Sequence, residues 1–393
     1  MKKIREIKIL FIFISIFWFS FSFSQTHNTF YQSVVDSVCY DTLLHHLQKF
    51  QSLGVKEVGT PQLVNAKKWL VNKYISMGYT NIQVDSFNHS GDELYNIIVN
   101  KTGTLYPDSI VFVTAHYDTQ TGTGTNDNGS GTSILLEIAR LIKDIPTKYS
   151  VRIIHFTGEE AGYLGSQHYV SNNSPKIRIV FNIDEVGGVA GINNNTISCE
   201  SDQSMPSTND AASQAFTDTL MTLTGLYTSL QTINTNAYGS DYMPFEYQNY
   251  TITGYYETNE STVVHSSNDL LANLDTSYVW EVCKGATAAT LYFAKAFQST
   301  VSCEEMTKEC AVNIFPNPFS NYLHLNIPNN ISACDFELFD LTGRLMKKVN
   351  DVQKMPVIHI SENLSSGYYF YKIISDQYGL IKSGILIKSF TKD

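Results

Sequence analysis

The sequence predicts a mixed, mostly parallel α/β sheet with helices on both faces, followed by a small all-β sandwich. Strand-like apolar runs alternate with segments of helical periodicity as far as residue 297. Several of these runs are apolar throughout, as in strands that are buried on both faces of a sheet. After residue 312 the helical period disappears, and short β-like runs are separated by Asn, Pro and Gly.

Composition and charge exclude two broad classes of protein. The 393-residue chain has 43% hydrophobic residues, which argues against intrinsic disorder. Its formal net charge is −10, whereas proteins that bind nucleic acid need Lys and Arg to neutralise phosphates. We therefore expect a folded protein that has no nucleic-acid partner.

Residues 1–24 have the pattern of a cleaved secretory signal peptide. A basic segment over 2–8 precedes an apolar run over 9–23, and Ser22-Phe23-Ser24 provides a small-x-small cleavage pattern. The alternative is an anchoring helix, but this run contains serines and falls short of the roughly 20 apolar residues that an anchor needs. We expect no transmembrane segment after cleavage. The six cysteines would then face an oxidising compartment, and their spacing matches no zinc finger.

The first secondary-structure elements follow from apolar spacing and turn residues. Residues 34–53 read as one helix, and Gly59-Thr60-Pro61 introduces a second that ends at Gly78. The periodicity then predicts a helix over 131–142, a long amphipathic helix over 278–297, and strands over 82–87, 95–99, 109–115, 151–156 and 177–183.

A domain boundary lies in the Glu-, Lys- and Cys-rich stretch over 302–311. We expect a linker over 301–312 and a β-sandwich over 313–393. Within the sandwich, the expected strands are 323–327, 336–340, 368–374 and 384–387.

Side chains that can bind a metal follow three of the predicted strands. His116 and Asp118 come after the strand 109–115, and residues two apart in an extended chain point the same way. Asp118 is therefore placed to accept a hydrogen bond from the ring of a ligating His116. Pairs of carboxylates follow the next two strands, namely Glu159-Glu160 and Asp184-Glu185. Because strand ends of one direction meet at one edge of a sheet, the sequence predicts a divalent metal site there.

The loop GTGTNDNGSGTS before the helix 131–142 contributes one more carboxylate. It lacks the Gly-Lys-Ser/Thr of a P-loop, and Ser130 does not lie in a GxSxG nucleophile turn. The loop offers Asp127, which can serve as a metal ligand or as a helix cap.

Four segments resemble the metal-binding blocks of the M28 family of zinc aminopeptidases, in that family's order. They are AHYDTQTGTGTNDNGSG, FTGEEAGYLGSQHYV, FNIDEVGG, and GSDYMPFEYQNYTITGYYE with VVHSSND. The resemblance spans roughly residues 50–300. It implies a peptidase domain over 25–300 with a zinc-exopeptidase-like fold.

The resemblance also implies a site with two Zn²⁺ ions. Its five ligands would be His116 and Asp184 on one zinc, Glu160 and His265 on the other, and Asp127 as the bridge. Glu159 would be the general base, and the peptide bond between Asp127 and Asn128 would be cis. Tyr238 is a candidate for stabilising the oxyanion. Tyr242 departs from the family pattern, because many relatives have a His there.

The C-terminal region resembles the sorting domain (type A) of type IX secretion substrates, which belong to Bacteroidetes. The resemblance rests on VNIFPNPFSNYLHL, FELFDLTGRLM and LSSGYYFYKI with a terminal GILIK. It implies the type IX machinery as a partner. It also implies a secreted or cell-surface location, reached through the periplasm of a Gram-negative cell. The alternative is a β-sandwich module with a binding role.

Together, the two resemblances imply a secreted zinc aminopeptidase that hydrolyses the N-terminal peptide bond of peptides with a free N-terminus. The nearest alternative is a glutaminyl cyclase with one zinc, although the chain lacks the insertion after the acidic pair that we associate with cyclases. A carboxypeptidase of the same family is another alternative. A non-catalytic binding module is a third, but such a module would have no reason to keep Glu159 with all five ligands.

Overall fold

The computed structural model describes residues 25–298, 312–327, 334–352, 357–361, 364–375 and 379–389. The chain divides into two compact units between Gln298 and Ser299. The expected signal peptide, Cys303, Cys310 and the expected linker up to residue 311 lie outside the described residues. Within the described ranges, no helix has both the length and the apolar character needed to cross a membrane.

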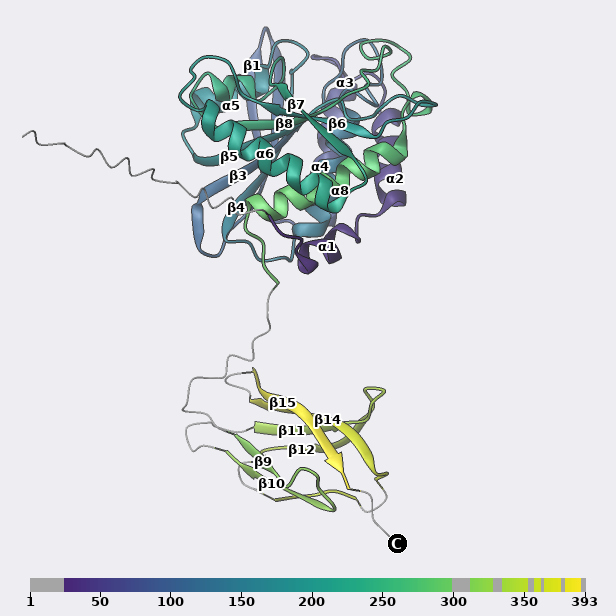
Figure 1. Cartoon of the computed structure of the whole chain (residues 1–393), viewed down its shortest axis with the longest axis vertical. Helices are drawn as coiled ribbons and strands as arrows, with labels where there is room; N and C mark the ends of the chain where they lie inside the picture. Colours follow the sequence, from purple (N-terminus) through teal and green to yellow (C-terminus); the bar gives the residue numbers. More distant parts are fainter. Residues whose placement is uncertain are drawn as a thin grey trace, which may run out of the picture. The chain divides into compact units, whose positions relative to one another are not determined.

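The first unit is built on an eight-stranded sheet with the order β1-β2-β4-β3-β5-β8-β6-β7 (Figure 1). The central strands β4, β3, β5 and β8 are parallel, whereas β1, β2 and β6 pair antiparallel with their inner neighbours. The bounds are β1 (Ile82–His89), β2 (Asp92–Lys101), β3 (Tyr106–His116), β4 (Tyr149–Phe156), β5 (Lys176–Ile183), β6 (Thr196–Ser201), β7 (Gln231–Asn236) and β8 (Ile252–Glu257). The predicted fold class is confirmed.

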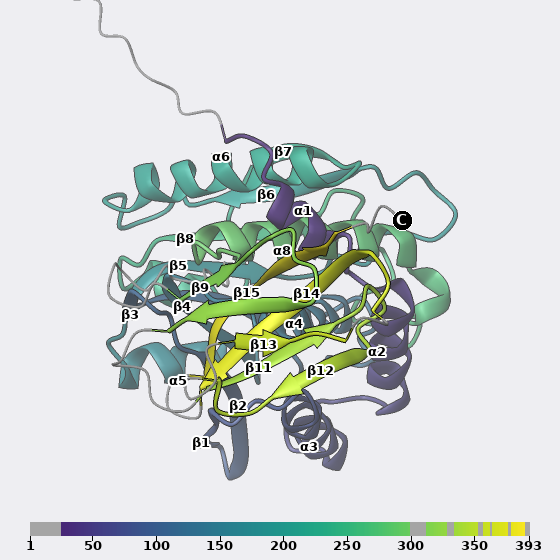
Figure 2. The ribbon, with the colours of Figure 1, turned by 90° about the horizontal axis from the view of Figure 1, so that it is seen from below.

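Helices cover both faces of this sheet because the central strands are apolar on both sides. Along β3, Val111 and Val113 belong to one hydrophobic cluster and Phe112 to another. The first cluster includes side chains of α1 (Thr29–Val35), α2 (Tyr40–Ser52), α3 (Pro61–Ser76), α4 (Gly129–Ile142), α6 (Asp210–Tyr227) and α8 (Thr276–Phe293). Figure 2 shows α6 and α8 near each other, and the two helices are in contact. The second cluster includes α5 (Leu164–Asn172) and α7 (Met243–Glu246), and a 3-10 turn (Leu271–Asn273) precedes α8.

The expectation of one helix over 34–53 is wrong, because the chain breaks between α1 and α2. The backbone N–H of Cys39 donates to the Glu137 carboxylate at 2.8 Å. The backbone carbonyl of Val38 accepts from the Trp280 indole at 3.0 Å. These tertiary partners take over backbone groups that a continuous helix would have paired internally.

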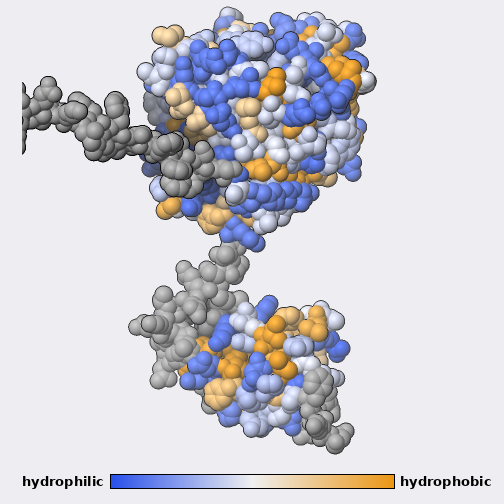
Figure 3. Space-filling view, viewed as in Figure 1, coloured by the Kyte–Doolittle hydropathy of each residue, from blue (hydrophilic) through white to orange (hydrophobic). Residues whose placement is uncertain are grey.

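The second unit consists of two antiparallel sheets, which confirms the expected all-β region. One sheet has the order β13-β10-β9 and the other β12-β11-β14-β15. Side chains of both, such as Leu325 and Phe336, share one hydrophobic core. Figure 3 shows hydrophobic residues grouped on the visible face of this unit. The bounds are β9 (Asn313–Phe315), β10 (Tyr322–Asn326), β11 (Cys334–Phe339), β12 (Leu345–Val349), β13 (Val357–His359), β14 (Gly367–Ser375) and β15 (Gly379–Lys388).

Candidate metal centre

His116 is the last residue of β3, the strand at which the direction of the chain connections reverses. β4 lies on one side of β3 and β5 on the other, and such a switch point is where open α/β sheets bind ligands. The His116 Nε2 lies 3.1 Å from Asp127 Oδ1 and 3.2 Å from Asp184 Oδ1. Its Nδ1 lies 3.2 Å from the backbone oxygen of Asp118 and donates to it. The ring therefore turns Nε2 toward two carboxylates, which is the orientation of a metal ligand.

A second group of donors shares Asp127 with the first. The His265 Nε2 lies 2.9 Å from Asp127 Oδ2 and 3.0 Å from Glu160 Oε2. Asp127 thus presents one oxygen to each histidine. The first group consists of His116, Asp127 and Asp184, and the second of Asp127, Glu160 and His265. Within each group, the possible ligand atoms lie within 4.8 Å of one another. The structure brings together all five ligands that the resemblance implies.

The electrostatics of these groups favour a cation between them. The hydrogen bond to Asp127 raises the pKa of His265 to about 9, and Glu160 adds to the rise. Burial raises the pKa of Glu160 to about 8, with a further contribution from the charge on Asp127. A proton on the histidine and a proton on the glutamate both compensate the same excess of negative charge. A divalent ion would do this more completely, because it can contact the three donors Asp127, Glu160 and His265 at once.

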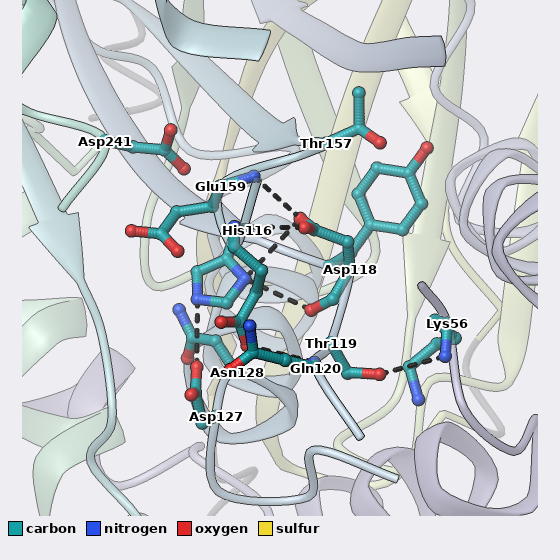
Figure 4. Close-up of polar contacts among 12 residues, drawn as sticks. Lys56, His116, Asp118, Thr119, Gln120, Asp127, Asn128, Thr157, Glu159 and Asp241 are labelled. Atoms are coloured by element: carbon teal, nitrogen blue, oxygen red, sulfur yellow. Dashed lines mark hydrogen bonds and ion pairs between the residues drawn. The ribbon is translucent and has the colours of Figure 1, made fainter. Parts of the chain in front are cut away.

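Asp118 fixes the turn that carries the acidic pair. Its two carboxylate oxygens accept the backbone N–H groups of Glu159 and Glu160, each at 3.2 Å. Figure 4 shows the Asp118 carboxylate directed toward the backbone nitrogen of Glu159 and toward the ring of His116. A further backbone N–H, that of Gln120, donates to Glu160 at 3.1 Å. The positions of Glu159 and Glu160 relative to β3 therefore depend on Asp118.

Asp118→Asn is expected to lower the affinity of this site for a divalent metal by about 10- to 100-fold, the usual effect of removing a group that orients metal ligands. An amide retains only one accepting oxygen, so one of the two N–H groups loses its partner. Competition with a chelator measures the affinity, and Asp108→Asn, an exposed position on β3, is the control. Equal affinities in the two variants would contradict this role.

The loop that carries Asp127 is held by residues that the sequence did not single out. Asp269 accepts the backbone N–H groups of Asn126 at 2.7 Å and of Asp127 at 3.1 Å. The Asp127–Asn128 peptide is cis, as the resemblance implied. Asn128 caps α4 by accepting the N–H of Gly131 at 2.8 Å. The helix cap, which was the alternative role for Asp127, thus belongs to the next residue, and both Asp127 oxygens face the histidines.

Ser240 also escaped the sequence analysis. Its hydroxyl donates to Asp184 Oδ2 at 2.5 Å, while Oδ1 of the same carboxylate faces His116. This bond directs one oxygen of Asp184 into the site. Ser240 lies in the fourth resembling block, but its partner is 56 residues away, so spacing offered no signal.

A cavity of about 310 Å³ opens beside the two donor groups. Besides ligand residues, its lining includes Glu159, Tyr163, Glu185 and Gly239. Tyr238, the candidate for oxyanion stabilisation, is 61% exposed, and it is the adjacent Gly239 that lines the cavity. The role of Tyr238 stays a prediction.

Comparisons with known proteins agree with both resemblances. Residues 96–290 match the model of peptidase family M28, and residues 313–388 match that of the secretion system C-terminal sorting domain. Aminopeptidase YwaD of Bacillus subtilis (strain 168) is 31% identical over 259 residues, which are 59% of this chain and 54% of the relative. The chain therefore spans about half the length of this relative.

Solved structures show the same fold at low sequence identity. The LapA aminopeptidase of Legionella pneumophila superposes with a TM-score of 0.62 at 19% identity, over 76% of this chain and 81% of that one. A glutaminyl cyclase of Macrostomum lignano superposes with a TM-score of 0.60 at 16% identity, over 68% of this chain and 93% of that one. Since an aminopeptidase and a cyclase share this fold, the chemistry has to be argued from the site.

Proposed function

We propose that this chain is a secreted zinc aminopeptidase. The chain belongs to peptidase family M28 through residues 96–290, and it carries a secretion system C-terminal sorting domain at residues 313–388. The observation that carries the proposal is the pair of metal-donor groups that share Asp127 beside a cavity lined by Glu159. The similarity to an aminopeptidase over 259 residues supports it.

The residues at the site fit two zinc ions. His116 and Asp184 would hold one ion, His265 and Glu160 the other, and Asp127 would bridge them. Each ion would then have three protein ligands of the nitrogen and carboxylate types that zinc prefers, and a position left open for reactants. Bound zinc supplies a Lewis acid that polarises a carbonyl and lowers the pKa of water.

Glu159 is the residue we assign as general base. Its carboxyl lines the cavity, and its backbone is fixed by Asp118. It would take a proton from the attacking water and pass it to the leaving amine as the peptide bond breaks. The adjacent Glu160 is occupied by His265 and by the N–H of Gln120, so only Glu159 of the pair is free to move a proton.

A panel of matched substrates tests the function. Leucyl peptides with a free N-terminus should be hydrolysed, N-acetylated copies should resist, and chelation should abolish the activity. Cleavage only at the C-terminus would instead indicate a carboxypeptidase. Ring formation from N-terminal glutamine without hydrolysis would indicate a cyclase, and no turnover of any substrate would indicate a binding module.

Removing residues 313–393 is expected to abolish export without abolishing activity. All the proposed site residues lie in the first compact unit, so this unit should remain folded and active. We propose that the sorting domain is recognised by type IX machinery of a Bacteroidetes-like cell, so the truncated protein should accumulate in the periplasm. Fractionation of such a host measures this. If the truncated protein reaches the medium at the normal level, the type IX assignment fails.

A further inference from the structure

We propose that Glu185 binds an ammonium group of the substrate. The inference rests on the proposed function, because it takes the cavity beside the two metal-donor groups as the place where the substrate reacts. The shared chemistry is a primary ammonium, which occurs both at a free N-terminus and on a lysine side chain. Glu185 would thereby determine which substrates the site accepts.

The backbone places Glu185 at the cavity although it belongs to neither metal-donor group. It follows Asp184 directly after β5, and its φ of 45° lies in the left-handed region, which is uncommon for residues other than glycine. Its carbonyl accepts the N–H of Glu257 at 2.9 Å, which ties this turn to the end of β8. As a result two consecutive carboxylates serve one site, with Asp184 facing His116 and Glu185 lining the cavity.

The Glu185 carboxyl is held by one neutral partner. The hydroxyl of Tyr256, on β8, interacts with it and favours its ionised form. Within the described ranges, no Lys or Arg forms an ion pair with Glu185. The tyrosine can fix the direction of the side chain, but it brings no positive charge.

The charges around the cavity indicate that a cation is needed beside Glu185. The cavity lining has no Lys or Arg, but it has five carboxyl groups: Asp127, Glu159, Glu160, Asp184 and Glu185. Two zinc ions would bring four positive charges, which three ligand carboxylates and the base Glu159 balance. Glu185 is the lining carboxyl that neither the two ions nor a Lys or Arg would balance, and its ionised form in a partly buried cavity is costly without a cation. A substrate ammonium would supply the missing cation through a charge-assisted hydrogen bond.

Glu185→Gln is the test, because it keeps the shape and removes the charge. The zinc-loaded variant should retain its metal but bind leucinamide or lysinamide at least about tenfold more weakly, as expected for the loss of one hydrogen bond to a charged group. Binding of N-acetyl-leucinamide should not change. Tyr256→Phe, which frees the carboxylate but keeps its charge, should show a smaller loss. Glu260→Gln, at an exposed position, is the matched control.

Calorimetry with these three ligands separates the two sources of ammonium. A loss for both amides assigns Glu185 to the N-terminal ammonium, and a loss for lysinamide alone assigns it to a basic side chain. Unchanged affinities, or loss of zinc from Glu185→Gln, would overturn the proposal. Because binding is measured directly, a protein that binds amines through Glu185 but hydrolyses no peptide would refute the proposed function and leave this inference standing.

Discussion

Glu159→Gln is expected to keep both zinc ions and lose most of its turnover. Glutamine preserves the shape of the side chain but cannot accept the proton of the attacking water. Removing a general base typically costs about 10² to 10⁴ in rate, or roughly 3 to 5.5 kcal/mol of barrier. Metal analysis and steady-state kinetics on the same sample measure both effects.

The neighbouring residue provides the matched control for this experiment. Glu160 Oε2 lies 3.0 Å from His265, so Glu160→Gln should weaken one metal position and lose zinc. Asp118 fixes both glutamates through equivalent hydrogen bonds, so a general disturbance of the turn would affect the two variants alike. If Glu159→Gln loses zinc while Glu160→Gln retains it, the two roles are reversed.

Asp127→Asn is expected to lose zinc together with activity. Asp127 Oδ1 lies 3.1 Å from His116, and Oδ2 lies 2.9 Å from His265. An amide would place an NH₂ group at one of these positions, where it cannot act as a ligand. It would also remove the negative charge that offsets repulsion between two dications about 3.5 to 4 Å apart. We expect the variant to be as inactive as the chelated enzyme.

Zinc content and rate should fall in parallel in Asp127→Asn, in contrast to Glu159→Gln. Asp144→Asn is the control for the loss of one carboxylate, because that side chain is 88% exposed. An Asp127→Asn protein that holds two zinc ions and turns over normally would show that this carboxylate does not bridge the metals.

The sequence predicted the strands that carry the site because these strands are apolar on both faces. β3, β4 and β5 pack against helices on either side, so their apolar runs stood out without any knowledge of pairing. β7 (QTINTN) lies at the edge of the sheet and is largely exposed, and its polar sequence gave no strand signal. Sequence analysis also missed β6, β8 and α6.

The candidate site was predictable where a residue follows an apolar strand. His116, the acidic pair and Asp184 all do so, but His265 lies in a loop and was identified only through the resemblance. The residues that hold the metal-donor side chains in place could not be predicted from the sequence, for a different reason. Asp269 binds backbone N–H groups more than 140 residues away, and any residue has such groups, so no pattern in the sequence marks the partner.

Titration of zinc into the metal-free protein, with hydrolysis of a leucyl amide followed at each step, tests the central claim most directly. If two metal positions share Asp127, the protein should bind nearly two equivalents of zinc per chain. Hydrolysis should be restored as both positions fill. Binding that ends at one equivalent, with cyclisation of N-terminal glutamine in place of hydrolysis, would contradict the account.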